Sequence, residues 1–349
     1  MTLREKAGQL LLVGFRGLEV SERSPIVRAI RSGCAGGVVL FDRDLARGGR
    51  PRNVRSLRQV RKLIAALQQA SAIPLLVAVD QEGGRVARLK KEQGFPQAPA
   101  ARALGRADDL ERTRRHAAAT AAALAAAGFN LNFAPVVDLD VHPGNPIIGR
   151  HGRSYSADPA VVVRHAAAVI EAHRELGIVC CLKHFPGHGS SRGDSHLGLT
   201  DVSETWEAAE TEPFRALIAA GLADAVMTAH VFNRRLDPAF PATLSRPVIE
   251  EMLRRQLGFR GVVISDDLDM RAITGEFDRE RAMELALNAG NDILLIANNM
   301  TFAADAAPRA LEAILGLVAA GRVSAARIDE ACGRVLELKA GLSGAAGGI

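Results

Sequence analysis

The chain has 349 residues, of which 48% are hydrophobic and 24% are charged. This is the composition of an ordinary globular protein, and it excludes a disordered, collagen-like or disulfide-scaffold protein. Lysine and arginine outnumber aspartate and glutamate by 44 to 39, a formal net charge of +5, which suits an acidic ligand without requiring one. The four cysteines favour a reducing compartment, since two of them are neighbours with poor geometry for pairing; they are Cys34, Cys180, Cys181 and Cys332.

Two apolar segments decide whether export or membrane insertion is expected. The run 8–15 follows basic residues, as in a secretory signal, but Glu5 and Arg16 limit it to about eight residues, so we interpret it as a strand. The longest uncharged stretch, 116–137, is alanine-rich and holds two asparagines and a proline where a membrane span is most apolar. We therefore predict a cytoplasmic protein with no membrane partner.

Short runs rich in branched apolar residues, most of them ending in a polar residue, recur along the chain. Their apolar positions are continuous rather than alternating, as expected for strands buried on both faces of a parallel sheet. The predicted strands are 8–15, 36–41, 74–80, 131–138, 178–184, 225–230, 261–266 and 292–298.

The segments between these runs have helical character, and most end at a glycine, the usual helix C-cap. Helices are predicted over 53–71, 108–128, 158–177, 203–221, 246–258, 278–290, 301–321 and 325–342. Eight strand–helix units predict a (β/α)8 barrel of the TIM type, with an open doubly wound sheet as the alternative. No linker divides the chain, so we expect one domain over 1–349, with a glycine-rich flexible tail at 343–349.

Arginines are dense between residues 43 and 61, a pattern found in nucleic-acid-binding proteins. The spacing of Arg55, Arg58 and Arg61 places them on one helix face, opposite apolar residues such as Val60. We interpret this face as solvated. Because aromatic residues make up only 4% of the chain and no nucleic-acid-reading motif is present, we predict no nucleic-acid partner.

Polar residues follow the predicted strands repeatedly. In a (β/α)8 barrel the catalytic groups come from the C-terminal ends of the strands. A single carboxylate there often only caps the next helix, but together these residues predict a pocket with a polar rim. They are Asp80, Asp138, Lys183, His184, His230, Asp266 and Asp267.

The loop at 183–198 carries three histidines, a lysine and an aspartate, and its four glycines are expected to make it mobile. Asp194 and His196 lie two residues apart, so in an extended segment both side chains project to the same side. A carboxylate beside an imidazole raises its proton affinity and favours acid/base catalysis; the alternative is a loop tied down by an Asp–His hydrogen bond. Asp266 follows an apolar strand, where a rigidly held nucleophile is expected, and Asp267 is expected to cap a helix or hold the site in shape.

Several motifs carry a resemblance to a known family: 80–88, 149–155, 183–188, 194–196 and 265–268. They resemble glycoside hydrolase family 3 and, within it, the single-domain β-N-acetylhexosaminidases of bacterial cell-wall recycling. The resemblance covers nearly the whole chain, and its Lys-His-Phe-Pro-Gly-His-Gly element is highly specific. The chain departs from the family at Ser190 and Ser191, where an acidic residue followed by threonine is common, and in the more basic character of 149–155.

The resemblance implies that Asp266 is the nucleophile that forms a glycosyl-enzyme, that His196 is the acid/base, and that Asp194 is its dyad partner. It implies that Asp80 hydrogen-bonds sugar hydroxyls. The residues implied to line the subsite of the N-acetylglucosamine ring are Arg88, Arg153, Lys183 and His184. The substrate implied is an N-acetylglucosaminyl-anhydromuramyl peptide, and we expect a monomer with no cofactor and no metal ion.

Three other functions stay open. A metal-dependent barrel hydrolase would use the histidines as zinc ligands, although such enzymes usually draw a His-x-His pair from their first strand and no histidine precedes His116. A non-catalytic sugar-binding or peptidoglycan-binding barrel would not need the nucleophile and the dyad. A β-glucosidase or β-xylosidase of family 3 generally carries a second domain that supplies a glutamate acid/base, for which this chain has no room.

Overall fold

The computed structural model describes residues 1–194 and 197–345. In these ranges eight parallel strands form one sheet, hydrogen-bonded in the order β13-β11-β9-β8-β5-β2-β1-β14. In chain order the strands are β1 Leu11–Gly14, β2 Gly37–Val39, β5 Leu76–Val79, β8 Leu131–Asn132, β9 Val179–Phe185, β11 Ala225–Thr228, β13 Val262–Ile264 and β14 Leu294–Ile296. A parallel bridge between Ile264 and Ile293 joins the two ends of this order, so the sheet closes into a barrel. The predicted (β/α)8 fold is confirmed.

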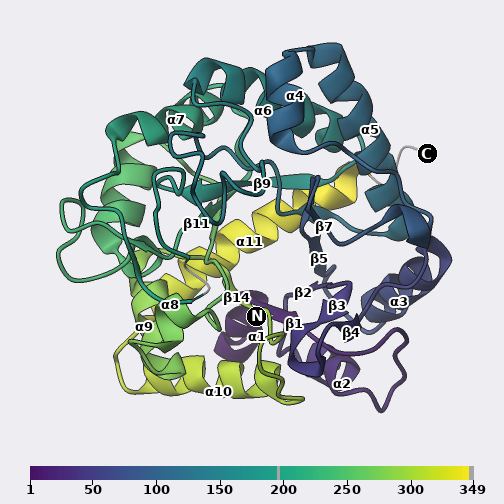
Figure 1. Cartoon of the computed structure of the whole chain (residues 1–349). Helices are drawn as coiled ribbons and strands as arrows, with labels where there is room; N and C mark the ends of the chain where they lie inside the picture. Colours follow the sequence, from purple (N-terminus) through teal and green to yellow (C-terminus); the bar gives the residue numbers. More distant parts are fainter. Residues whose placement is uncertain (195–196, 346–349) are drawn as a thin grey trace.

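Helices ring the barrel (Figure 1). The α-helices are α1 Leu3–Gln9, α2 Pro25–Arg31, α3 Leu57–Gln69, α4 Ala101–Ala107, α5 Leu110–Ala127, α6 Pro159–Arg174, α7 Glu212–Ala219, α8 Arg271–Thr274, α9 Arg279–Ala289, α10 Ala306–Ala319 and α11 Ala325–Ala345. Tighter or wider turns are η1 Leu45–Arg47, η2 Lys91–Gln93, η3 Ala208–Thr211, η4 Ala242–Leu244 and the π-helix η5 Pro247–Gln256. Short strands in the loops are β3 Arg43–Asp44, β4 Arg50–Pro51, β6 Gln81–Gly83, β7 Val86–Ala87, β10 Thr200–Asp201 and β12 Val231–Phe232.

The prediction of a strand over 8–15 is wrong for residues 8–10, which belong to the end of helix α1 and its cap. Thr2 Oγ1 accepts a hydrogen bond from the Glu5 backbone N–H at 3.2 Å, and the Glu5 carboxylate accepts one from the Thr2 N–H at 2.7 Å. This capping box starts helix α1, so the strand begins only at Leu11.

Two helix predictions also differ from the structure. In the segment predicted as a helix over 203–221, residues 203–207 are not helical; the 3-10 turn η3 starts at Ala208, and the α-helix runs only from Glu212 to Ala219. Helix α11 continues to Ala345, past the predicted end at 342, while residues 346–349 lie outside the described part of the chain. None of the helices in the described ranges is both long and apolar enough to cross a membrane.

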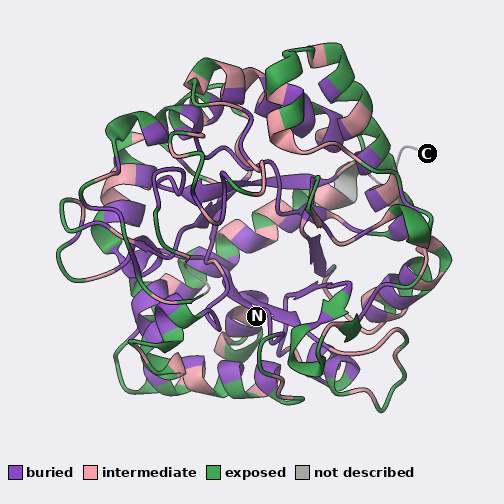
Figure 2. Cartoon of the chain, in the orientation of Figure 1, coloured by how far each residue is buried: buried purple, intermediate pink, exposed green. Residues whose placement is uncertain are grey.

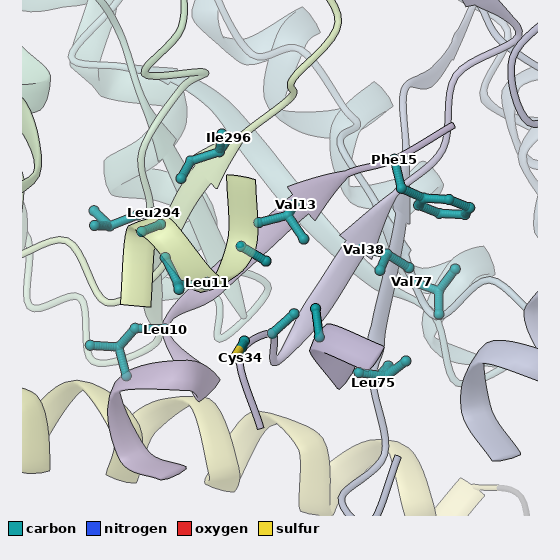
Figure 3. Packing of buried hydrophobic residues seen from close by; sticks show 14 of the residues in the cluster. Leu10, Leu11, Val13, Phe15, Cys34, Val38, Leu75, Val77, Leu294 and Ile296 are labelled. Atoms are coloured by element: carbon teal, nitrogen blue, oxygen red, sulfur yellow. The ribbon is translucent and has the colours of Figure 1, made fainter. Parts of the chain in front are cut away.

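Side chains of successive strand residues are buried on both faces of the barrel, as the continuous apolar runs predict. Figure 3 shows the outer layer, in which Leu11 and Val13 of β1 pack beside Leu294 and Ile296 of β14. Leu12 points the other way and belongs to the cluster that fills the barrel interior. The helices turn their buried faces toward the sheet and their exposed faces outward (Figure 2). On α3, Val60 is buried whereas Arg58 and Arg61 are exposed, as predicted for a solvated face.

Helix α11 runs across the middle of the ring (Figure 1) and packs against the barrel interior through Val335. A buried carboxylate at the start of β14 fixes this arrangement. Asp292 is fully buried and accepts hydrogen bonds from Arg327 and Arg334 of α11 at 2.7 and 3.1 Å, and from Arg254 of η5 at 2.6 Å. Helix α11 therefore covers one end of the barrel, and the polar residues that follow the strands lie at the other end.

Candidate active site

A pocket of 690 Å³ lies at the C-terminal ends of the barrel strands. Seven of the eight side chains predicted for the site line it: Asp80, Arg88, Arg153, Lys183, His184, Asp194 and Asp266. The eighth, His196, lies outside the described residues. Of the two arginines Arg150 and Arg153 in the 149–155 motif, Arg153 lines the pocket, whereas Arg150 is exposed and is not one of its lining residues. The sequence therefore predicts which loops meet at this end of the barrel.

Alternating charges form one wall of the pocket. Lys183, at the end of β9, donates to Asp80 at 2.9 Å and lies 2.7 Å from a carboxylate oxygen of Glu82. Arg153 donates two hydrogen bonds to Glu82, at 2.8 and 2.7 Å. Arg88 donates to the second oxygen of Asp80 at 3.2 Å. Asp80, Arg88, Arg153 and Lys183 line the pocket, and Glu82 pairs with Arg153 and Lys183 without being one of the lining residues.

This ion cluster stays charged at neutral pH. Burial alone would raise the pKa of Glu82, but the charges of Arg153 and Lys183 outweigh it and lower the pKa to about 2. The pKa of Asp80 is lowered further by Lys183 and Arg88, again against burial. The pKa of Lys183 is raised, because the carboxylates of Asp80 and Glu82 outweigh its own burial. Fixed charges of this kind suit the hydrogen-bonding hydroxyls of a sugar.

Asp138 orients the histidines of the loop from behind. Its carboxylate accepts from Nδ1 of His184 at 2.7 Å and from the backbone N–H of His188 at 2.8 Å. His184 therefore turns Nε2 forward, where Arg153 Nη2 lies 3.4 Å away. His188 hydrogen-bonds Ser191 at 2.7 Å, and burial lowers its pKa to about 4, so it is neutral at physiological pH.

Asp266 stands at the end of β13 and its position is fixed by its neighbours. The Asp267 backbone N–H donates to Asp266 Oδ1 at 2.8 Å. Asp267 in turn accepts from the N–H groups of Asp269 and Ala297 at 3.1 and 2.8 Å. Of the two roles expected for it, these contacts fit support of the site better than a helix cap, since the N-cap of α8 is Met270. Burial, together with the charge of Asp269, raises the pKa of Asp267 to about 8. The carboxyl beside Asp266 therefore binds a proton more readily than an ordinary aspartate.

The expectation that four glycines make the 183–198 loop mobile is wrong for the first two. Gly187 and Gly189 are buried. A Cβ on Gly187 would lie 2.6 Å from the Cβ of Glu210, and one on Gly189 would lie 1.9 Å from the Leu139 carbonyl oxygen. These glycines permit close packing of the loop against its neighbours. Residues 183–191 are buried, and the first exposed residue of the loop is Arg192.

His230, a predicted rim residue, is not part of the pocket. It is fully buried, with Nδ1 2.8 Å from the Thr243 hydroxyl and Nε2 2.9 Å from the Asp267 carbonyl oxygen. It thus supports the backbone beside Asp266. Among residues 1–194 and 197–345, no group of three or more His, Cys, Asp or Glu side chains is arranged to hold a metal ion.

Comparison with known proteins identifies the family. The model of the glycosyl hydrolase family 3 N-terminal domain matches residues 2–338. The chain belongs to glycosyl hydrolase family 3. It is therefore a glycoside hydrolase, and its pocket with Asp266 and the ion cluster is the candidate active site of a family 3 enzyme.

Several relatives are similar over most of this family 3 chain. A β-hexosaminidase of Tolumonas auensis is 40% identical over 298 residues, 83% of each chain. A β-hexosaminidase of Xylella fastidiosa (strain 9a5c) is 40% identical over 326 residues, 89% of this chain and 92% of that protein. The structure of a family 3 β-N-acetylglucosaminidase from Paenibacillus sp. str. FPU-7 has a TM-score of 0.90 at 39% identity; it covers 100% of this chain, which spans 64% of that one. The structure of a β-N-acetylhexosaminidase from Beutenbergia cavernae DSM 12333 has a TM-score of 0.87 at 31% identity; the match covers 97% of this chain and 99% of that one.

The sequence did not reveal the supporting role of three carboxylates in the family 3 site. Glu82 lies within the 80–88 motif, but no role was predicted for it. Asp138 was expected on the rim of the pocket, whereas its carboxylate faces the backbone of the loop. Glu210 accepts hydrogen bonds from the backbone N–H groups of Gly189 and Ser190. Burial raises the pKa of Glu210 to about 7. The position of Asp138 at the end of a predicted strand could have indicated its role, whereas no sequence motif points to Glu210.

Proposed function

We propose that this chain is a retaining β-N-acetylhexosaminidase that removes terminal non-reducing N-acetylglucosamine from peptidoglycan fragments. The observation that carries the proposal is the pocket, in which a strand-end carboxylate, Asp266, shares one cavity with Asp194 and with the ion pair of Asp80 and Lys183. The two β-hexosaminidases that are 40% identical over most of the chain support hexosaminidase activity.

The proposed reaction has two steps. In the first, a carboxylate oxygen of Asp266 attacks the anomeric carbon while the bond to the leaving oxygen breaks and His196 gives that oxygen a proton. In the second, His196 takes a proton from water, which attacks the anomeric carbon and releases Asp266. Asp194 is proposed to stabilise the imidazolium form of His196, which enters the first step and is restored by the second.

Sugar binding is proposed to use the ion cluster without changing its protonation. Asp80 accepts from sugar hydroxyls while Lys183 and Arg88 keep it ionised. Arg153 and His184 present nitrogen atoms close to each other at the same wall, where they suit the polar groups of the N-acetylglucosamine ring. Since these groups are already fixed by one another, little ordering is required on binding.

Basic side chains in the lining of the pocket are the reason to propose a leaving group with a negative charge. Arg43, Arg85 and Lys90 line the same pocket as Asp266. A lactyl or peptide carboxylate of an anhydromuramyl peptide fits such a surface. Such fragments would reach the enzyme in the cytoplasm, and the four free cysteines support a reducing compartment.

The first experiment compares aryl N-acetyl-β-glucosaminides with the matching aryl β-glucosides. We expect release of N-acetylglucosamine to be far faster than release of glucose. Equal or faster cleavage of the glucoside would refute the proposed specificity. The acid/base assignment is tested with His196→Ala, which should slow substrates with poor leaving groups much more than activated aryl substrates, because the latter depart without a proton.

A further inference from the structure

A buried carboxylate lies outside the active-site pocket, beneath the loop that carries Asp194. Glu210 belongs to the 3-10 turn η3, and its relative exposure is 1%. Buried carboxylates are rare unless they are hydrogen-bonded or paired. The proposed reaction gives Glu210 no role. Its contacts with neighbouring residues therefore indicate what the buried carboxylate does.

Glu210 binds the backbone of the loop rather than a side chain of the pocket. Its Oε2 accepts the N–H of Gly189 at 3.0 Å and the N–H of Ser190 at 3.2 Å. Gly187 packs against it so closely that a Cβ there would lie 2.9 Å from the same oxygen. Two successive N–H groups converging on one carboxylate oxygen form a specific anchor for this turn of the chain.

Other side chains hold the same short segment. Trp206 Nε1 donates to the Pro186 carbonyl at 3.1 Å. Asn145 Nδ2 donates to the carbonyls of His188 and Gly189 at 2.7 and 3.0 Å. These contacts involve carbonyl oxygens, so they leave the N–H groups of Gly189 and Ser190 to Glu210.

The anchored segment ends just before the dyad aspartate. Ser190 and Ser191 are buried, whereas Arg192 and Gly193 are exposed and Asp194 is half-buried at the pocket. Asp194 lies four positions after Ser190, a span of at most about 14 Å in extended chain. A change in the direction of the backbone at Ser190 is therefore carried directly to Asp194.

We infer that Glu210 is a positioning residue for catalysis: it fixes the backbone at Gly189 and Ser190 and so sets where Asp194 stands in the pocket. The inference rests on the proposed function, in which Asp194 supports protonation of the leaving group. Without the Glu210 carboxylate, two buried N–H groups lose their acceptor and the segment has to rearrange to satisfy them. Glutamine retains one carbonyl oxygen at this position and restores the anchor in part.

The experiment compares Glu210→Ala and Glu210→Gln with wild type and with Glu207→Gln. Glu207 is an exposed glutamate one turn earlier in the same segment and serves as the matched control. kcat/KM is measured for the N-acetylglucosamine disaccharide, a poor leaving group, and for an activated dinitrophenyl N-acetyl-β-glucosaminide. For Glu210→Ala we expect a loss of at least about tenfold on the disaccharide and less than about threefold on the activated substrate, since only the former needs the proton. Glu210→Gln should lie between wild type and Glu210→Ala, and Glu207→Gln should match wild type.

A readout that does not depend on activity separates this inference from the proposed function. Amide hydrogen exchange of peptides covering 186–194 should be faster in both Glu210 variants and unchanged in Glu207→Gln. Equal losses on the two substrates, or unchanged exchange at Gly189 and Ser190, would overturn the positioning role. If wild type cleaves neither substrate, the proposed function fails, while the exchange experiment still tests the anchor.

Discussion

Glu82→Gln tests whether the ion cluster is as tightly coupled as its geometry indicates. Glu82 accepts two hydrogen bonds from Arg153 and lies 2.7 Å from Lys183, and its side chain is 6% exposed. These partners lower its pKa from 4.5 to about 2. A change of one unit in pKa corresponds to about 1.4 kcal/mol, so this lowering of the pKa contributes about 3 kcal/mol to the free energy of unfolding. Breaking a buried ion pair typically costs about 3–5 kcal/mol, in agreement.

The assay is urea unfolding of wild type and Glu82→Gln between pH 7 and pH 3. Because the folded-state pKa of Glu82 lies below its unfolded-state value, the contribution is complete above pH 4.5 and disappears as the pH falls toward 2. The difference in the free energy of unfolding should thus be about 3 kcal/mol at pH 7 and about half of that by pH 3. Glu111→Gln is the control, since Glu111 is 75% exposed and pairs only with Arg114 of the same helix; it should change stability by less than about 0.5 kcal/mol. A difference below about 1 kcal/mol for Glu82→Gln, or one that does not vary with pH, would refute the coupling.

Three further predictions concern the frame of the barrel and its chemistry. Asp292→Asn should lower the free energy of unfolding by about 3–5 kcal/mol, because three arginines lose a fully buried carboxylate; urea unfolding measures it, and a loss under 1 kcal/mol would speak against the network. His173 donates from Nδ1 to the Val169 carbonyl and accepts at Nε2 from Asn132; burial lowers its pKa to about 4. This pKa lies below the unfolded value near 6.5. The stability contribution of neutral His173 is therefore complete above pH 6.5 and is lost as the pH falls toward 4. The free energy of unfolding should fall less over this pH range in His173→Gln than in wild type. Finally, chelator-treated protein should retain full glycosidase activity, whereas loss of activity that zinc restores would favour a metallohydrolase.

The fold was predictable because each strand is buried on both faces and so has a continuous apolar run. Leu11, Leu12 and Val13 are all buried although they point to different layers. The N-terminal boundary was not predictable from hydrophobicity, since the apolar residues of α1 continue into β1. The capping box of Thr2 and Glu5 is the local feature that separates them.

The catalytic candidates were predictable because barrel geometry gathers the ends of the strands in one place. Their supporting contacts were not, because they join positions far apart in the chain. Glu82 and Arg153 are 71 residues apart, and Glu210 reaches a loop 20 residues away. Gly187 and Gly189 look like hinges in the sequence, and only the neighbouring Glu210 and Leu139 show that they serve close packing.

The most direct test of the central claim is covalent trapping of the nucleophile. The enzyme is incubated with a slow fluorinated N-acetylglucosaminide, and the digested protein is analysed by peptide mass spectrometry. We expect one glycosyl adduct on Asp266, which lies in the pocket beside Asp267, and no adduct in Asp266→Asn. No adduct in wild type would favour attack by the acetamido group of the substrate itself, and an adduct on another residue would contradict the assignment of Asp266.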